Sequence, residues 1–268
     1  AWTEKRLGAG LPYTRMTDMT FLSRDEALLL FNGEEDHGTT LAVYSFSRQQ
    51  IICKCRFPFQ FPFRVLFLKR PESRFGDKRQ SSSAKLLIPD PSVDILGVNF
   101  KLEEDPTSSW SCIVLSLHRF QNMYKSLLEK HPGRDVFDWE EWGPSVTRWL
   151  PQQSITPIGN RSIFGSRMIA WGLPTASDTD SGLSSCLLLL DFNPGPIYHD
   201  TALEREGKSR GTIVREETIW EDSQVGLKVK SSLPYRVFTA PHIPLGFDFR
   251  FDGSTIMAKW NGMKNKRE

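Results

Sequence analysis

Short apolar runs separated by polar turns dominate the first sixty residues. The apolar runs are residues 19–22, 27–31, 41–46 and 51–57, and turn-forming residues occupy 23–25, 32–38 and 47–50. Residues 41–46 alternate between the two faces of a strand, whereas residues 28–31 are continuously apolar, as in a strand covered on both faces. The pattern predicts a four-stranded meander, which is the size of one propeller blade.

The strand pattern continues to the end of the chain, with one interruption. Apolar positions 120, 123, 124, 127 and 128 repeat at helical spacing, and His-Pro-Gly at 131–133 ends the helix. Further strands are predicted at 93–102, 111–117, 163–170, 187–192, 212–220, 225–229 and 235–239, with a closing hairpin at 247–251 and 255–260. The stretch T-F-L-S-R-D-E-A-L-L-L-F resembles the inner part of a WD-type repeat, without its Gly-His or Trp-Asp dipeptides. We predict an all-β, β-propeller-like fold of WD type with irregular blades and one short inserted helix near residues 119–130.

The flanking segments suggest the domain organisation. We expect residues 1–16 to be a disordered or truncated upstream segment, residues 17–262 to form a single propeller-like domain, and residues 263–268 to be a polar tail. The first residues contain neither an initiating Met nor a signal-peptide core, which suggests a longer parent protein. Prolines within the Phe-rich stretch 57–67 favour an edge strand or hydrophobic connector over a peptide-binding strip. Residues 69–85 are charged and Ser-rich, so a surface loop is expected there.

Three of the eight tryptophans fall within residues 138–151, DWEEWGPSVTRWLP. Indoles at this density either pack between other elements or form an aromatic binding surface. Gly143-Pro144 predicts a turn inside the segment, which lies between the helix and a buried strand. This position favours a latch that pins the helix onto a sheet. The alternative is a ligand platform, which requires the tryptophans to be exposed.

Composition narrows the choice of partner and compartment. The net charge is +2, so the chain does not resemble a dedicated nucleic-acid or membrane-surface binder. The longest apolar run, 186–190, is far shorter than the roughly 20 residues that span a bilayer. Sparse cysteines fit an intracellular compartment, cytoplasmic or nuclear. Cys53 and Cys55 share one face of a predicted strand and are expected to be buried, inert thiols.

Common catalytic signatures are absent from the sequence. It contains no Gly-x-Ser-x-Gly elbow, phosphate-binding Gly-rich loop with Lys, or His-Glu-x-x-His. The adjacent acids Glu140-Glu141 and Glu216-Glu217 would point to opposite faces of a strand, so neither pair forms a catalytic dyad. No cysteine or histidine spacing indicates a metal site. We therefore predict no enzymatic activity, no catalytic, cofactor-binding or metal-binding residues, and no cofactor.

A family resemblance enters with the tryptophan segment. The stretch L-S-L-H-R-F-Q-N-M-Y-K-S-L-L, an acidic spacer and W-E-E-W-G-P-x-x-T-R-W resemble the C-terminal, substrate-receiving region of the large fungal family of F-box proteins. Stretches at 160–168, 187–194 and 225–237 agree in the same order, so the resemblance covers most of residues 90–260. The signature residues, expected to be structural, are Trp139, Glu140, Glu141, Trp142, Gly143, Pro144, Thr147, Arg148 and Trp149.

The resemblance implies a substrate receptor of a Skp-cullin-F-box ubiquitin ligase. In that family an N-terminal F-box binds a Skp-type adaptor, and a β-rich C-terminal region receives the target protein. Residues 1–16 do not resemble an F-box, so the adaptor is expected to bind only through an F-box missing from this chain. The expected partner is an unknown target protein, without nucleic acid or membrane. Alternatives are a WD-type propeller scaffold unrelated to ubiquitin and a β-propeller hydrolase, which would need carboxylates or histidines converging in one pocket.

Overall fold

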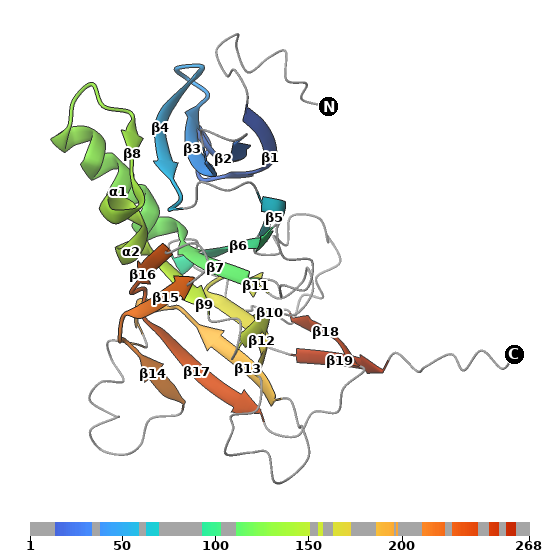
Figure 1. Ribbon diagram of the computed structural model, residues 1–268. Coiled ribbons are helices and arrows are strands. Elements are labelled where there is room, and N and C mark those ends of the chain that lie inside the picture. Colours follow the sequence, from blue (N-terminus) through green and yellow to red (C-terminus); the bar gives the residue numbers. More distant parts are fainter. Residues whose placement is uncertain are drawn as a thin grey trace, which may run out of the picture. The chain divides into compact units, whose positions relative to one another are not determined.

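A computed structural model of the chain is shown in Figure 1. It describes residues 14–33, 38–58, 63–69, 93–102, 111–150, 155–157, 163–172, 186–195, 197, 211–222, 227–240, 247–251 and 256–260. The described part is mostly β, as predicted, with several antiparallel sheets and two α-helices. The chain divides into two compact units, 1–69 with 96–149 and 215–233, and 70–95 with 150–214 and 234–268. The expectation of one domain over 17–262 stays a prediction.

The first unit contains the predicted meander. Strands β1 (Thr14–Phe21), β2 (Glu26–Gly33), β3 (Thr40–Ser45) and β4 (Gln50–Arg56) pair antiparallel in chain order, and β8 (Val136–Phe137) adds parallel to β4. β1 begins inside the segment 1–16 that was expected to lie upstream of the domain, because residues 14–16 pair with 31–33. Residues 1–13 and the predicted tail 263–268 lie outside the described part.

A second sheet and a hairpin complete this unit. β5 (Phe63–Lys69), β6 (Ile95–Leu102), β7 (Ser111–Ser116) and β9 (Thr147–Leu150) are ordered β5-β6-β7-β9, and β15 (Thr218–Asp222) pairs with β16 (Leu227–Ser231). The Phe-rich stretch 57–67 thus contains an edge strand, β5, as its prolines predicted. The continuous strand predicted at 212–220 is wrong, because residues 215–217 separate two strands that belong to different sheets. The loop predicted at 69–85 falls almost entirely outside the described residues.

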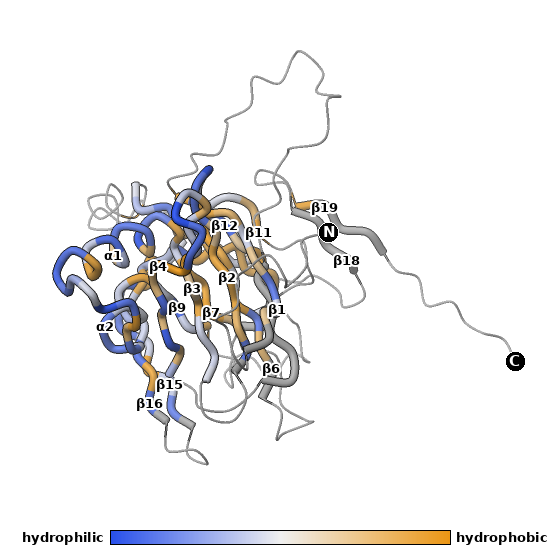
Figure 2. The backbone as a smooth tube through the Cα atoms, turned by 90° about the horizontal axis from the view of Figure 1, so that it is seen from above, coloured by the Kyte–Doolittle hydropathy of each residue, from blue (hydrophilic) through white to orange (hydrophobic). Residues whose placement is uncertain are grey.

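The predicted helix is present as α1 (Leu117–Lys130), which starts two residues earlier than expected. Phe120 and Tyr124 are buried, and Met123, Leu127 and Leu128 pack against the same core. Figure 2 shows hydrophobic stretches along β2, β3 and β7, whereas most of the α1 residues are hydrophilic. The apolar stripe of α1 is therefore a core face.

The sequence pattern did not predict a second helix, α2 (Trp139–Val146). The turn predicted at Gly143-Pro144 is wrong, because both residues lie inside this helix. A capping box formed by Asp138 and Glu141 starts the helix, and Val146 ends it two residues after Pro144. Pro144 lacks the N–H that would donate to the Glu140 carbonyl one turn earlier, so α2 lacks that hydrogen bond within its short length. Glu140 and Glu141 lie on a helix, so the strand-based argument about their directions does not apply.

The second unit is a six-stranded sheet with a separate hairpin. Its strands are β10 (Ile155–Pro157), β11 (Ile163–Phe164), β12 (Arg167–Gly172), β13 (Cys186–Asp191), β14 (Thr212–Val214) and β17 (Tyr235–Ala240). They run in the order β10-β12-β13-β17-β14, and β11 pairs with β12. The predicted closing hairpin is present as β18 (Phe247–Phe251) and β19 (Ile256–Trp260), while its turn lies outside the described residues.

Neither of the two helices in the described part of the chain is long and apolar enough to cross a membrane.

Candidate functional site

The three tryptophans of the 138–151 segment are buried. Trp139 is 3% exposed, and Trp142 and Trp149 are 0% exposed. They belong to a core cluster that also draws side chains from β2, β3, β4, β6, β7 and α1. A ligand platform would place these indoles on an open surface, so the segment contributes to the interior of the first unit.

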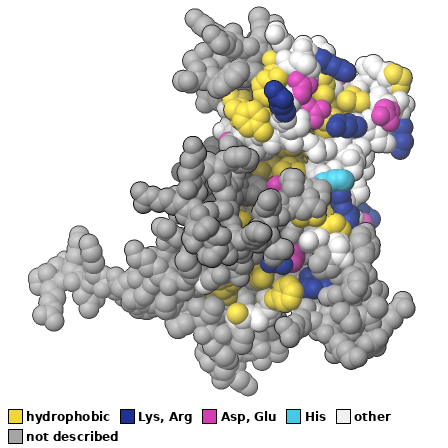
Figure 3. Space-filling model, turned by 180° about the vertical axis from the view of Figure 1, so that it is seen from behind, with side chains coloured by type: hydrophobic (Ala, Val, Ile, Leu, Met, Phe, Trp, Pro, Cys, Tyr) yellow, Lys and Arg dark blue, Asp and Glu magenta, His cyan; other side chains and the backbone are white. Residues whose placement is uncertain are grey.

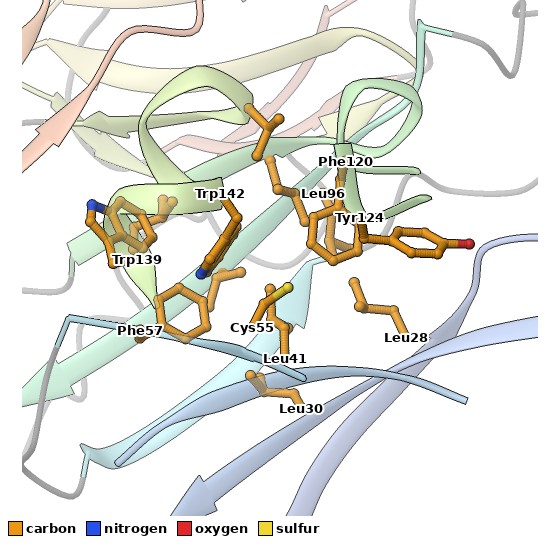
Figure 4. Packing of buried hydrophobic residues seen from close by; sticks show 14 of the residues in the cluster. Leu28, Leu30, Leu41, Cys55, Phe57, Leu96, Phe120, Tyr124, Trp139 and Trp142 are labelled. Atoms are coloured by element: carbon orange, nitrogen blue, oxygen red, sulfur yellow. The ribbon is translucent and has the colours of Figure 1, made fainter. Parts of the chain in front are cut away.

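The two tryptophans of α2 connect this helix to α1 and to the end of β4 (Figure 4). Their ring centroids lie 4.9 Å apart in an edge-to-face arrangement, and the Phe57 ring stacks on Trp139 at 5.8 Å. Trp142 also meets the edge of Phe120 from α1 at 5.9 Å. Its indole Nε1 donates a hydrogen bond of 2.9 Å to the Arg56 carbonyl at the end of β4. The helix α2 is thereby held against both α1 and β4.

The start of α2 is fixed by charged groups. Glu141 accepts hydrogen bonds from both terminal guanidinium nitrogens of Arg134, at 2.8 and 2.6 Å, and from the Asp138 N–H at 3.0 Å. Partial desolvation opposes ionisation of Glu141, but the Arg134 and Asp138 hydrogen bonds outweigh it, and the pKa of this carboxyl lies below its ordinary value. The neighbouring Glu140 is exposed.

Arg148 is the most unusual residue of the signature, because a 0% exposed arginine lies in the middle of β9. Its Nε donates to the Leu233 carbonyl at 2.7 Å. Its Nη1 donates to the Glu216 carbonyl at 2.8 Å and to the Thr218 hydroxyl at 2.6 Å. The guanidinium therefore joins β9 to the start of β15 and to the segment after β16, which lie far away in sequence.

The remaining signature residues also contact segments that lie outside their own element. Trp149 stacks on Trp220 of β15 with ring centroids 4.6 Å apart, and the backbone N–H of Trp149 donates to the Ser231 hydroxyl at 2.8 Å. The buried Thr147 donates from its hydroxyl to the Gly143 carbonyl at 2.6 Å. The half-buried Pro144 accepts the Ser232 N–H at 2.8 Å. Together with α2, these contacts link segments across the whole first unit.

Sequence reasoning did not find the partners of this cluster. Phe57 was assigned to a connector, and Trp220 to a strand without a role. Phe57 packs on the α2 indoles, and Trp220 lies parallel to Trp149 with an interplanar angle of 14°. The only available signal was the presence of large aromatic residues at the ends of predicted strands. Their sequence distance from the signature gave no hint of contact.

A second cluster of side chains lies on the opposite face of the β1–β4 sheet. Alternate residues of β1–β4 point away from the core, and the antiparallel register aligns them in three rows. We call these rows the β1–β4 outer face: Phe21-Ala27-Tyr44-Ile51, Met19-Leu29-Ala42-Lys54 and Met16-Phe31-Thr40-Arg56. Five residues in the middle of the rows are 1–8% exposed and form a second core cluster: Ala27, Leu29, Phe31, Ala42 and Tyr44. Met16, Met19, Thr40 and Ile51 are only partly buried.

An aromatic group stands at one end of this face. The phenyl ring of Phe21 is 61% exposed and lies 5.9 Å from Phe46, which in turn meets the edge of Tyr44 at 5.4 Å. Ala27 lies between Phe21 and Tyr44 in the same row. Its small side chain leaves room for rings from β1 and β3 to approach across β2. Figure 3 shows hydrophobic and charged side chains side by side over the upper part of the molecule, where Figure 1 places these strands.

Charged side chains of both signs lie near the aromatic group. Arg24 and Arg48 are exposed in the two turns next to Phe21 and Phe46. The carboxylate of Asp25 is engaged by the Ser47 hydroxyl at 2.7 Å and the Ser47 N–H at 2.8 Å, which joins the two turns. The Ser47 hydroxyl lowers the pKa of Asp25 most, and the Ser47 backbone N–H, the Ser45 hydroxyl and the Arg48 charge add to it, so that the pKa lies below its ordinary value despite desolvation.

The rows themselves carry two cations and no carboxylate. Lys54 and Arg56 face Asp135 at 4.0 Å and Asp138 at 3.5 Å, at the far edge of the sheet. Glu26 occupies the opposite face of the sheet, where burial and, after it, the nearby Glu26 carboxylate raise the pKa of Tyr124. The outer face is therefore apolar in its middle, and its two cations lie at the β4 edge opposite carboxylates.

The thiols and other candidate ligands were also placed. Cys53 and Cys55 are buried with their sulfurs 3.7 Å apart, as the strand register predicted. Burial, followed by the neighbouring Cys53 thiol, raises the pKa of the Cys55 thiol. Within the described residues, no three His, Cys, Asp or Glu side chains lie close enough together to hold a metal ion.

Comparison with known proteins found no match for this chain among protein-family models, curated proteins or solved structures.

Proposed function

We propose that the chain is a protein-protein recognition domain that binds its partner through the exposed aromatic end of the β1–β4 sheet. The observation that carries this proposal is the Phe21 ring, which is 61% exposed and packs on the half-buried Phe46, itself in edge contact with the buried Tyr44. Exposed aromatic side chains on a rigid, well-packed sheet are typical of binding surfaces. The tryptophan cluster supports this face from the other side, because Trp142 bonds the end of β4.

The family resemblance gives this recognition a biological setting. In the proposal, the chain is the target-binding part of an F-box substrate receptor, and a Skp-type adaptor binds through an F-box. The proposal assigns no catalysis and no cofactor to the chain. It rests on the W-E-E-W-G-P-x-x-T-R-W string, in which Trp139, Trp142, Arg148 and Trp149 are buried in the first unit.

The test uses a reconstituted ligase. These 268 residues alone are expected not to bind a Skp-type adaptor, whereas the product of the full-length gene is expected to bind it. A target captured by the chain should be ubiquitylated by the complete ligase, and Phe21→Ser should abolish both capture and ubiquitylation. Adaptor binding by the chain alone, or a full-length gene without an F-box, would contradict the ligase assignment.

A propeller-like arrangement of the sheets belongs to the same proposal. The β1–β4 sheet supports it, because four antiparallel strands pair in chain order, as in a blade. The larger sheet of the second unit follows a different order and brings β14 beside β17. An experimental structure with sheets arranged around a common axis would establish the proposal, and sheets packed face to face as a sandwich would overturn it.

A further inference from the structure

We infer that the β15–β16 hairpin is a clasp that detaches from β9 and α2 while the β1–β4 sheet and α1 remain folded. Arg148 fastens this clasp, and a joint formed by residues 215–217 and 232–234 allows it to open. The inference concerns an internal motion of the chain and does not depend on the proposed partner.

The joint interrupts a β-ribbon that keeps one register on both sides. β14 pairs antiparallel with β17, where Val214 lies opposite Tyr235. β15 pairs antiparallel with β16, where Thr218 lies opposite Ser231. Three residues on each strand separate these two pairs, so the second hairpin continues the register of the first. By their register, the two hairpins are halves of one ribbon that is open at the joint.

Neighbouring segments take up the backbone groups of the joint. Glu216 and Leu233 would lie opposite each other in an unbroken ribbon, but both of their carbonyls accept hydrogen bonds from Arg148, at 2.8 and 2.7 Å. The N–H groups of Ser232 and Leu233 donate to carbonyls in α2 and β9, at 2.8 and 2.9 Å. Pro234 has no N–H to donate to a ladder. A ribbon without ladder pairing on both strands can bend at this point.

Polar contacts fasten the hairpin to β9. Besides the joint carbonyls, Arg148 donates to the Thr218 hydroxyl at 2.6 Å, and the backbone N–H of Trp149 donates to the Ser231 hydroxyl at 2.8 Å. Water can replace these partners when the clasp opens. The guanidinium is costly to bury and is favourably hydrated once exposed. The fastening therefore holds the hairpin in place but does not make its release as costly as exposure of an apolar core.

The hairpin also buries little apolar surface. Among its described side chains, Val229 and Trp220 pack in the core cluster, the latter by stacking on Trp149. Its other side carries the exposed Ile219 and two exposed Glu–Lys ion pairs. In the described part of the chain, β15 pairs with β16 alone. Two-stranded elements with few buried apolar contacts are among the least stable parts of a fold.

Native-state hydrogen exchange of the full chain, followed by NMR at low urea concentrations, tests the clasp. The N–H groups of Trp149, Ser232 and Leu233 should exchange through an opening that depends weakly on urea, because it exposes little surface. The N–H groups of β2 and β3 should exchange through global unfolding, with a steeper dependence on urea. Equal exchange free energies and urea slopes for the two sets would overturn the inference.

Two variants separate clasp opening from global unfolding. Leu29→Val, in the cluster on the other face of the β1–β4 sheet, should speed exchange in β2 and β3 about fourfold and leave the Trp149 and Leu233 N–H groups unchanged. Arg148→Lys should speed both sets at least about tenfold, because its hydrogen bonds are lost in either opening. The control Lys228→Gln, which removes an exposed ion pair of the hairpin, should change exchange less than about threefold.

Equal acceleration of both sets by Leu29→Val would overturn the inference, since the hairpin would then open only together with the β1–β4 sheet. Exchange of the Trp149 and Leu233 N–H groups at the wild-type rate in Arg148→Lys would overturn the fastening role of Arg148. If Arg148→Lys does not fold, the urea dependence of wild-type exchange and the Leu29→Val variant still decide.

Discussion

At the scale of single residues, Arg148 shows how a charge can be part of a core. Its Nε and Nη1 donate to the carbonyls of Leu233 and Glu216 and to the Thr218 hydroxyl, where the side chain is 0% exposed to water. The positive charge also contributes, after backbone hydrogen bonds to Glu216 itself and Arg215, to a lowered pKa of Glu216. An isolated buried charge is costly, so these acceptors are required for the fold.

Replacement of Arg148 by Met should destabilise the protein by about 3–5 kcal/mol, because the buried carbonyls and hydroxyl would lose their donor. Urea unfolding followed by tryptophan fluorescence measures this change. Arg148→Lys should retain part of the stability, since one ammonium cannot reproduce the guanidinium geometry. Arg24→Met, an exposed control, should alter stability by less than about 0.5 kcal/mol. Unfolding of Arg148→Met at the wild-type urea concentration would contradict the assigned role.

Glu141 gives a pH-dependent prediction at the same scale. Its folded-state pKa lies below the reference value of 4.5, so its stabilisation is complete above that pH and is lost as the pH falls through the folded-state value. Glu141→Gln should cost about 0.5–1 kcal/mol at neutral pH, and the difference from wild type should shrink in acid. Unfolding curves at several pH values test this. The control Glu140→Gln, at an exposed carboxylate on the same helix, should show a smaller pH dependence, and equal behaviour of the two variants would contradict the prediction.

At the scale of elements, side-chain packing explains why glycine occupies position 143 of α2. A Cβ atom at position 143 would overlap ring carbons of Trp139 on the preceding turn. Glycine normally destabilises a helix by about 1 kcal/mol relative to alanine. In α2 that penalty is outweighed by the close approach of the indole, which itself stacks on Phe57.

Gly143→Ala should therefore destabilise the protein by about 1–3 kcal/mol, although the same change in an open helix would stabilise it. The double variant Gly143→Ala with Trp139→Leu should recover part of the loss, because the smaller side chain leaves room for the methyl group. Thermal or urea unfolding distinguishes the outcomes. A stabilised Gly143→Ala single variant would show that the indole moves away at little cost.

The elements differ in how far local sequence defines them. The β1–β4 meander and α1 follow directly from alternation, helical spacing and turn residues, which act between close neighbours. α2 was missed because Gly-Pro is a strong local turn signal, and the Asp138–Glu141 capping box that overrides it was not weighed. The short strand β8 was missed because its two residues gain their place only by pairing with β4.

At the scale of the whole molecule, the reactivity of the cysteine thiols shows where the interior becomes accessible to solvent. Cys53, Cys55 and Cys112 are buried, whereas Cys186 is half-buried. Modification of the three buried thiols should require unfolding and should accelerate with urea, while Cys186 should react first. Mass spectrometry after timed exposure to a thiol reagent measures each site. Rapid modification of Cys53 or Cys55 without denaturant would show local opening of β4.

Part of the candidate site could be identified from the sequence, and the rest only from the structure. The signature residues were identified from sequence, and their structural role was expected from the resemblance. The outer face was not identified, because Phe21, Phe46 and the two arginines come from separate turns and become neighbours only through the strand register. Single residues in separate turns cannot be recognised as neighbours from the sequence until the pairing of the strands is known.

The sequence by itself determined the mostly β character, the position of α1, the shared face of Cys53 and Cys55, and the unusual tryptophan segment. These depend on the spacing of apolar residues and on local turn chemistry. Only the tertiary structure decided that the tryptophans are interior, that Arg148 joins distant strands, and that Phe21 is exposed. The reason is physical: burial and exposure depend on which distant segments cover a side chain, and the chain meets those segments only when its sheets have formed.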